Sequence, residues 1–237
     1  MNLRNPEEID PQIFELFEFR PRKGDFKKIE IIMATIDCLA SEGLEKTTYD
    51  AIAKRLGTRR AHVAYHFGDK NEIFTHCIKY IVANYQQSSL EHIKTAKTKR
   101  EMLFNYIDGP FNWAKDNPQE ITVMLLFYYF CCIKNEFLEL HQQIRKGGVE
   151  RIQFILSGVL SEYLQNYSGE NKIEQEKLLF LQTPQPLNTM AKDIQNIISG
   201  TLLDMRTTKL PTAKDYEDTK EKCKQDIWKM IESTIKN

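Results

Sequence analysis

The chain has 237 residues, enough for one large domain or two smaller ones with a buried core. Its 33 basic and 33 acidic side chains give a formal net charge of zero, which excludes a uniformly basic protein but leaves room for a local excess of charge. The five cysteines form no CxxC pair and no apolar leader opens the chain, so we expect reduced thiols in a cytoplasmic protein.

Apolar residues recur at helical spacing along most of the chain, and prolines and glycines are few. This pattern predicts an all-α protein. The first helix is predicted at about residues 25–42, because apolar side chains step by three and four from Phe26 to Ala40 and Gly43 supplies a stop. The preceding residues 1–24 are predicted to be an N-terminal extension.

Two short helices are predicted next, on either side of a tight turn. The second helix of the chain begins after Thr48, whose side chain can cap it, and ends at Gly57. The third begins near Arg59 and stops around residue 67, because Asp69 and Glu72 have the spacing of a capping box that opens a fourth helix. Two helices joined by a tight turn that contains glycine have the form of a helix-turn-helix.

The rest of the chain is predicted to be helical as well. The expected helices cover about residues 70–94, 99–116, 119–133, 135–166, 186–206 and 213–235. Turn signals predict breaks at Gly109-Pro110, Asn117-Pro118, Ser168-Gly169 and Pro184 to Pro186, and Gly147-Gly148 makes the continuity of the long helix doubtful.

Two of these later segments have an unusual composition. Residues 168–186 mix charged residues with the apolar run LLFL, so we expect a long or partly mobile connection there. The apolar run at 121–133 is shorter than the roughly 20 residues that cross a bilayer. We therefore expect a core helix there and no membrane partner.

Basic residues are concentrated in the predicted helix-turn-helix. Between residues 54 and 70 the chain carries five basic residues against the single acid Asp69, although the whole chain is neutral. The five are Lys54, Arg55, Arg59, Arg60 and Lys70. Such a local excess is typical of a surface that lies against double-stranded DNA.

Residues 47–74, TTYDAIAKRLGTRRAHVAYHFGDKNEIF, resemble the DNA-binding region of TetR-family transcriptional regulators. The matching positions, in order and spacing, are Thr48, Ile52, Ala53, Gly57, Tyr65, Phe67 and Lys70. The resemblance implies an N-terminal three-helix DNA-binding domain at 25–70, followed by a larger helical bundle at 71–237 for dimerisation and effector binding. It also implies a homodimer that binds a palindromic operator, most often as a repressor.

The resemblance further implies which side chains meet DNA. Lys70 and Thr48 would bind phosphates at helix N-termini, and Arg59 and Arg60 would enter the major groove. The full expected set is Thr48, Arg59, Arg60, His62, Tyr65, His66 and Lys70. Val63 and Phe67 are expected to point inward. The basic cluster at residues 20–23 is either a solvated tail or an arm that reaches the DNA.

The chain departs from the family pattern at three positions. Arg59 replaces a small hydroxyl residue, His62 replaces a frequent threonine, and Ala64 replaces a tyrosine that binds phosphate. These changes predict an unusual operator. His62 and Ala64 also keep open the alternative that the helix-turn-helix has become a protein-binding surface that no longer binds DNA.

Other chemistries have weak support in the sequence. His62 and His66 have the four-residue spacing of a zinc pair, but no third ligand stands nearby, so no metal is expected. No GxSxG, Walker, Rossmann or HExxH motif occurs, so we expect no enzyme, no catalytic residue and no cofactor. Cys131 and Cys132 are either a redox pair or apolar filler in a buried helix.

The C-terminal helices carry two further predictions. Trp113, Phe127, Tyr128 and Cys131 are either plain core or, as the resemblance implies, the lining of a pocket for a small apolar or aromatic effector. The last two long helices are expected to form a four-helix dimer interface with their symmetry mates. Its predicted residues are Ile194, Ile198, Leu202 and Met205 on one helix and Ile227 and Ile231 on the other.

Overall fold

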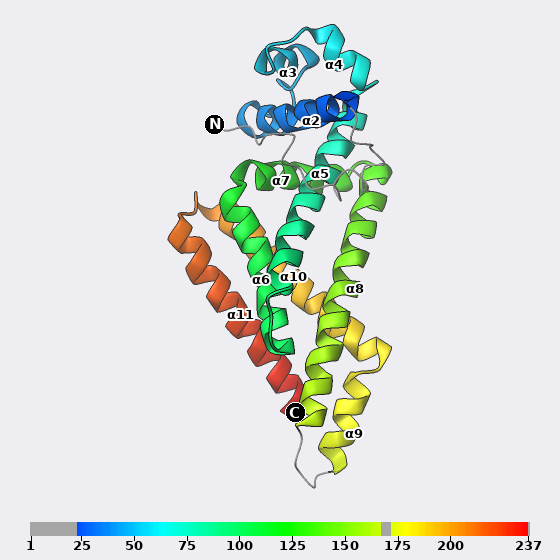
Figure 1. The fold of residues 1–237 in the computed structure, drawn as a ribbon, viewed down its shortest axis with the longest axis vertical. Helices are drawn as coiled ribbons and strands as arrows, with labels where there is room; N and C mark the ends of the chain where they lie inside the picture. Colours follow the sequence, from blue (N-terminus) through cyan, green and yellow to red (C-terminus); the bar gives the residue numbers. More distant parts are fainter. Residues whose placement is uncertain (1–22, 167–171, 237) are drawn as a thin grey trace. The chain divides into compact units, whose positions relative to one another are not determined.

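The computed structural model describes residues 23–166 and 172–236, which form helices and no strands (Figure 1). The helices are α2 (Lys23–Glu42), α3 (Tyr49–Arg55), α4 (Arg60–His66), α5 (Lys70–Ile93), α6 (Lys99–Asp116), α7 (Pro118–Cys131), α8 (Asn135–Gln165), α9 (Lys172–Leu181), α10 (Pro184–Thr208) and α11 (Ala213–Lys236). The prediction of an all-α protein is confirmed. The predicted extension lies outside the described residues except for its last two positions, which already belong to α2.

The chain divides into two compact units. Unit 1 comprises residues 1–85 and 117–138, and unit 2 comprises residues 86–116 and 139–237. Helices α2 to α4 and α7 therefore belong to unit 1, and α6 and α9 to α11 belong to unit 2. The boundary that we expected at residue 70 falls inside unit 1. In the part of the chain that is described, no helix is long and apolar enough to cross a membrane.

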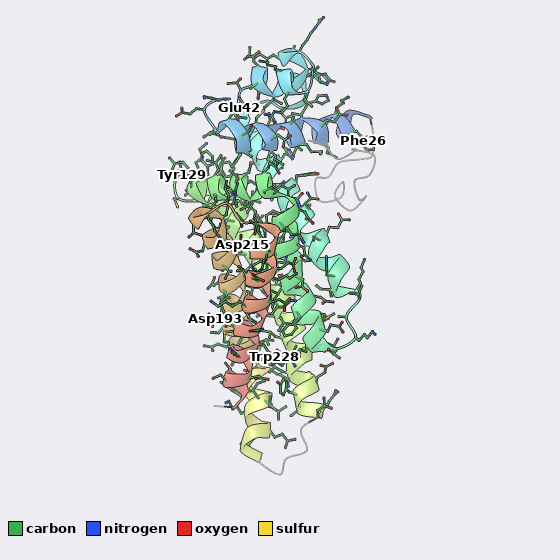
Figure 2. All side chains as sticks on the ribbon, turned by 90° about the vertical axis from the view of Figure 1, so that its left-hand side faces the viewer. Phe26, Glu42, Tyr129, Asp193, Asp215 and Trp228 are labelled. Carbon is green, nitrogen blue, oxygen red and sulfur yellow. The ribbon has the colours of Figure 1, made fainter. Side chains whose placement is uncertain are left out.

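Helix α2 lies at the centre of unit 1, with α3 and α4 on one side and α7 on the other (Figure 1). Phe26 and Glu42 lie toward its opposite ends (Figure 2). Its buried side chains include Ile29, Ile31 and Ile32, so the helix is buried on more than the single stripe that the apolar spacing suggested. Because α2 is packed on two sides, it provides a fixed support for the helix-turn-helix.

An aromatic cluster forms the part of the unit 1 core where α5, α7 and the start of α8 meet. The ring of Phe74 lies 5.0 Å from that of Phe130 and 5.3 Å from that of Phe137, in edge-to-face geometry. Phe127 is fully buried and lies 6.2 Å from Phe137. Such edge-to-face pairs add specific geometry to a large apolar burial.

The predicted break at Gly109-Pro110 is wrong, because α6 continues through both residues. The reason is a close approach to α5. A Cβ atom on Gly109 would lie 2.6 Å from the Cα of Ser89 and 2.4 Å from its Oγ, so only glycine fits there. Proline removes one helical hydrogen bond at this point, and the burial of Pro110 and its neighbours holds the helix together despite that loss.

Helix α8 is likewise continuous through Gly147 and Gly148. The side chain of Gln195 on α10 donates a hydrogen bond to the carbonyl oxygen of Arg145 at 3.2 Å and ties the two helices together there. The connection expected at residues 168–186 contains the additional helix α9, whose Leu178 and Leu181 are buried. Helix α9 packs on α10 and α11.

The apolar stripes of α10 and α11 form the core of unit 2. Ile194, Ile198, Leu202, Ile227 and Ile231 are all buried within a single protomer, and Met205 is partly exposed. Helix α11 also packs on α6, with Trp228 toward its C-terminal half and Asp215 in its first turn (Figure 2). The side chains predicted for the interface thus contact residues of their own chain.

Candidate nucleic-acid interface

Helix α3 begins with the cap that the sequence predicts. Thr48 has extended backbone angles, φ −111° and ψ 163°, and its hydroxyl oxygen accepts a hydrogen bond from the amide of Ala51 at 3.1 Å. Asp50 follows in the first turn, where the helix dipole favours a negative charge. Ile52 and Ala53 are buried and hold α3 against α2.

The turn between α3 and α4 depends on Gly57, which has a φ of +64°. This left-handed conformation is costly for residues that carry a Cβ atom. The amide of Thr58 donates to the carbonyl oxygen of Ala53 at 2.9 Å, which closes the end of α3 before the chain enters α4. The sequence therefore sets the angle of the helix-turn-helix locally.

Helix α4 is held down by its inward face. Val63 is 0% exposed and Phe67, directly after the helix, is 1% exposed, as predicted. The hydroxyl of Tyr49 donates to the carbonyl oxygen of Phe67 at 3.2 Å and links the start of α3 to the end of α4. These contacts fix the direction of the opposite face, which points to solvent.

Helix α5 begins at Lys70, and its cap confirms the predicted capping box with one change. The amide of Glu72 donates to Asp69 Oδ1 at 2.8 Å. The carboxylate of Glu72 accepts from the amide of Gly68 at 2.7 Å, one residue before the cap. Lys70 is thereby exposed at a helix N-terminus, the position from which a cation and free amides can meet a phosphate.

The predicted DNA-binding residues differ in exposure. Arg59, Arg60 and Lys70 are exposed, and Tyr65 is 84% exposed, whereas Thr48, His62 and His66 are half-buried. The rings of His62 and His66 are 4.9 Å apart. Burial lowers the pKa of His66, and the nearby charges of His62 and of Lys28 at the start of α2 lower it further. His66 thus lies toward α2, and its neutral form is favoured.

Ion pairs divide the basic residues into two groups. Arg55 lies 3.3 Å from Glu42 and 3.7 Å from Asp37, so it joins α3 to α2. Arg60 lies 3.6 Å from Asp50. In the described ranges, Lys54, Arg59 and Lys70 form no ion pair within 4.0 Å, and their charges remain available to a polyanion. The role of Arg55 could not be predicted from local spacing, because its partners lie on another helix.

The two histidines of α4 have no third metal ligand. No group of three or more histidine, cysteine, aspartate or glutamate side chains that could hold a metal ion occurs in the described part of the chain. The pair is a ring contact on the surface of a short helix. Its chemistry is that of hydrogen-bonding and titratable groups beside the arginines.

The four residues predicted for an effector pocket are distributed over both units. Trp113 is buried in unit 2. Phe127 is fully buried in unit 1, and Tyr128 and Cys131 are half-buried there. The thiol of Cys131 donates a hydrogen bond to the carbonyl oxygen of Phe137 at 3.5 Å. Burial raises the pKa of this thiol. Cys132 is exposed.

Two cavities in unit 2 are lined by other residues. One of about 370 Å³ is lined by Ile93, Met102, Gly147, Glu150, Arg151, Phe154 and Ile155. The other, of about 520 Å³, lies between α10 and α11, and Gly200, Thr201, Asp204, Met205, Thr219 and Lys222 contribute to its lining. The first is mainly apolar with one arginine and one glutamate, and the second is bordered by charged side chains.

Comparison with known proteins connects this geometry with a family. Residues 31–77 match the family model of bacterial regulatory proteins of the tetR family. The chain is 26% identical over 111 residues to the HTH-type transcriptional regulator BetI of Stenotrophomonas maltophilia, a match that spans 46% of this chain and 57% of that protein. This chain therefore covers little more than half the length of that relative.

Two further similarities extend beyond the helix-turn-helix. The chain is 29% identical over 150 residues to the fatty acid metabolism regulator protein of Bacillus subtilis, covering 62% of this chain and 71% of that protein. The crystal structure of a transcriptional regulator from Rhodococcus has a TM-score of 0.67 and 17% identity, with 87% of this chain and 96% of that chain covered. The latter similarity concerns the fold.

Proposed function

We propose that this chain, a TetR-family transcriptional regulator, binds a palindromic operator in double-stranded DNA as a homodimer and represses the neighbouring genes. The observation that carries the proposal is the outward face of α4. Arg59, Arg60 and Tyr65 are exposed on it, while buried Val63 and Phe67 hold its other face to the domain. A helix presented in this way suits the major groove.

The proposed contacts follow from chemistry and position. The guanidinium groups of Arg59 and Arg60 suit the O6 and N7 acceptors of guanine, and His62, Tyr65 and His66 add hydrogen-bonding groups beside them. Lys70 and Thr48 suit phosphates on either side, because both stand at helix N-termini. The activity needs no catalytic residue, no metal and no cofactor, and we expect it in the cytoplasm, where the DNA is.

The proposed dimer uses the outward faces of α10 and α11. Gly200 and Asp204 are exposed there, and Thr201 lies beside them at the cavity between the two helices. Small side chains on α10 allow a helix of a second copy to approach closely. A two-fold symmetric dimer carries two copies of α4, as a palindromic operator requires.

The proposed effector is a small apolar or aromatic molecule that releases the DNA. Trp113, Phe127, Tyr128 and Cys131 are the location proposed from the sequence, and the open apolar depression that contains Phe154 and Arg151 is a second candidate location. It would suit an apolar chain with an anionic end, and the name of the Bacillus subtilis relative makes fatty acids the first class to test. Such a ligand acts only through its differential affinity for the DNA-bound and free forms.

The test is the binding of random and genomic DNA fragments by the full chain, followed by removal of Lys70. Wild-type protein should enrich a short inverted repeat. Lys70→Ala should weaken binding to all sequences alike and reduce the slope of log affinity against log salt by about one unit per subunit. Lys79→Ala, an exposed lysine farther along the same helix, is the matched control and should leave the slope unchanged.

Two outcomes would contradict these assignments. An unchanged slope in Lys70→Ala would remove Lys70 from the phosphate contacts. Failure of the wild-type protein to retain any DNA at low salt would overturn the regulator proposal and favour the alternative of a protein-binding helix-turn-helix.

A further inference from the structure

An acidic residue stands among the basic groups of the candidate interface. Asp50 is the second residue of α3, and its side chain is 74% exposed. Its Oδ2 lies 3.6 Å from Nε of Arg60, the first residue of α4, whose side chain is 68% exposed. A carboxylate on a surface that meets phosphates weakens the attraction to every DNA sequence, so its presence there calls for a specific role.

The contact between Asp50 and Arg60 is not explained by a contribution to folding stability. An ion pair between two side chains as exposed as these adds little to folding, because water and salt screen the charges and both side chains lose rotamer freedom. Asp50 also interacts favourably with the N-terminus of α3, but that interaction requires no arginine beside it. The contact with Arg60 is therefore the feature to be explained.

The backbone around the pair is fixed on both sides. Thr48 caps α3, Gly57 sets the turn, and the hydroxyl of Tyr49 binds the carbonyl oxygen of Phe67 at the end of α4. The backbone at Asp50 is thus held at a defined place relative to the first turn of α4, within reach of the Arg60 side chain. A flexible arginine that contacts it loses part of its conformational freedom before DNA arrives.

The contact also determines which donors of Arg60 remain. It is made by Nε, so the opposite edge of the guanidinium, formed by Nη1 and Nη2, is the edge left for another partner. Two parallel N–H donors on one edge match the O6 and N7 acceptors of guanine in the major groove. Lys54 and Arg59, which have no ion pair within 4.0 Å in the described residues, supply charge without such orientation.

We propose that Asp50 is a specificity-determining residue that positions Arg60 to contact one guanine of the operator. This inference rests on the proposed DNA-binding function. The carboxylate orients Arg60 toward the base, which increases discrimination between the operator and other sequences. Its negative charge lowers the affinity for every duplex and does not by itself discriminate between them.

The experiment selects bound duplexes from a random pool with full-length wild type, Asp50→Asn, Asp50→Glu, Arg60→Ala and the double variant Asp50→Asn/Arg60→Ala. Glu45→Gln, a change of the same charge at an exposed position between α2 and α3, is the matched control. Affinities are then measured for the selected site, for its single-base variants and for a duplex of unrelated sequence, and circular dichroism verifies folding.

We expect Asp50→Asn to bind unrelated DNA more tightly and to lose about tenfold in discrimination at one guanine position. Asp50→Glu keeps the charge and moves the carboxylate, so it should lose discrimination at that position without the gain for unrelated DNA. Arg60→Ala should lose the same preference, and adding Asp50→Asn to it should cause no further loss. Glu45→Gln should keep the wild-type preference.

Three results would overturn the inference. If Asp50→Asn bound all sequences more tightly by the same factor and kept the wild-type base preferences, Asp50 would act only as a negative charge that weakens binding to any DNA. A further change of preference by Asp50→Asn in the Arg60→Ala background would mean that the carboxylate contacts a base itself. Base preferences of Asp50→Glu identical to those of the wild type would show that the position of the carboxylate does not matter. Absence of any selected motif with the wild-type protein would instead contradict the proposed function.

Discussion

The helix-turn-helix and the α10–α11 pair were both predicted as helices from their sequences, but their surfaces turned out differently. In the helix-turn-helix, Val63 and Phe67 are buried and Arg59 and Arg60 are exposed, as predicted. In α10 and α11, the apolar side chains predicted to meet a second copy are buried within one protomer. Periodicity indicates that a helix face is buried, but it does not identify the surface that covers it.

The difference has a physical cause. The turn region is specified by interactions only a few residues apart, such as the Thr48 cap, the positive φ of Gly57 and the Asp69 cap. The burial of α10 and α11 depends in part on α6, which is far away in the chain. Local interactions can be predicted from spacing, whereas distant partners cannot.

The largest expected effect tests the importance of distant contacts. Gly109→Ala should destabilise the protein by about 2–3 kcal/mol, because the new Cβ would overlap the backbone of Ser89. Urea unfolding measures the loss. The matched control is Gly24→Ala on α2, where a Cβ atom would meet nothing within 4 Å and should add up to about 0.5–1 kcal/mol of stability. If both changes altered the free energy of unfolding by the same amount, the close approach of α5 and α6 could not explain the loss in Gly109→Ala.

The second prediction tests whether the outward face of α10 meets a second copy. Gly200→Gln leaves the protomer unstrained, since the space around this glycine is open, but it would obstruct a close helix–helix interface. The dimer dissociation constant should rise about tenfold or more, measured by sedimentation under reducing conditions. Gly24→Gln, at an open position on α2, is the control for a change of the same size. A Gly200→Gln protein that dimerises like wild type would exclude this face.

The smallest expected effect compares the two units at acidic pH. Burial lowers the pKa of His66 and His76 in unit 1 and of His141 in unit 2. Because these pKa values are depressed in the folded state, the neutral forms are favoured. The contribution of these neutral histidines to the free energy of unfolding is fully present above the ordinary histidine pKa of about 6.5. It decreases as the pH falls below that value.

A thermal melt should therefore show a small decrease in midpoint between pH 7.5 and about 5.5. His76→Gln should reduce this dependence, since His76 is half-buried and its ring lies 5.6 Å from that of Phe67. Ala64→Gln, at an exposed position of the same unit that carries no titratable group, is the control and should leave the dependence in place. A midpoint that is independent of pH in the wild type would contradict the burial of these histidines.

Helix existence was largely predictable, and the exceptions have identifiable reasons. The bounds of α6 and α8 agree to within one residue with the ranges predicted from the sequence. The expected break at Gly109-Pro110 did not occur, because tertiary packing outweighs the hydrogen bond lost at the proline. Helix α9 was missed because its segment mixes charged and apolar residues without a clear stripe. Of the candidate site, spacing predicted the caps and the inward residues, whereas the pairing of Arg60 with Asp50 required the fold.

The distribution of the two tryptophans has a practical consequence. Trp113 and Trp228 are the only tryptophans of the chain, both belong to unit 2, and both are buried. Selective excitation of indole fluorescence therefore reports the melting of unit 2 alone, while far-ultraviolet dichroism reports the helices of both units. Superimposable curves from the two signals would indicate a single cooperative transition, and separated curves would show that unit 1 unfolds independently.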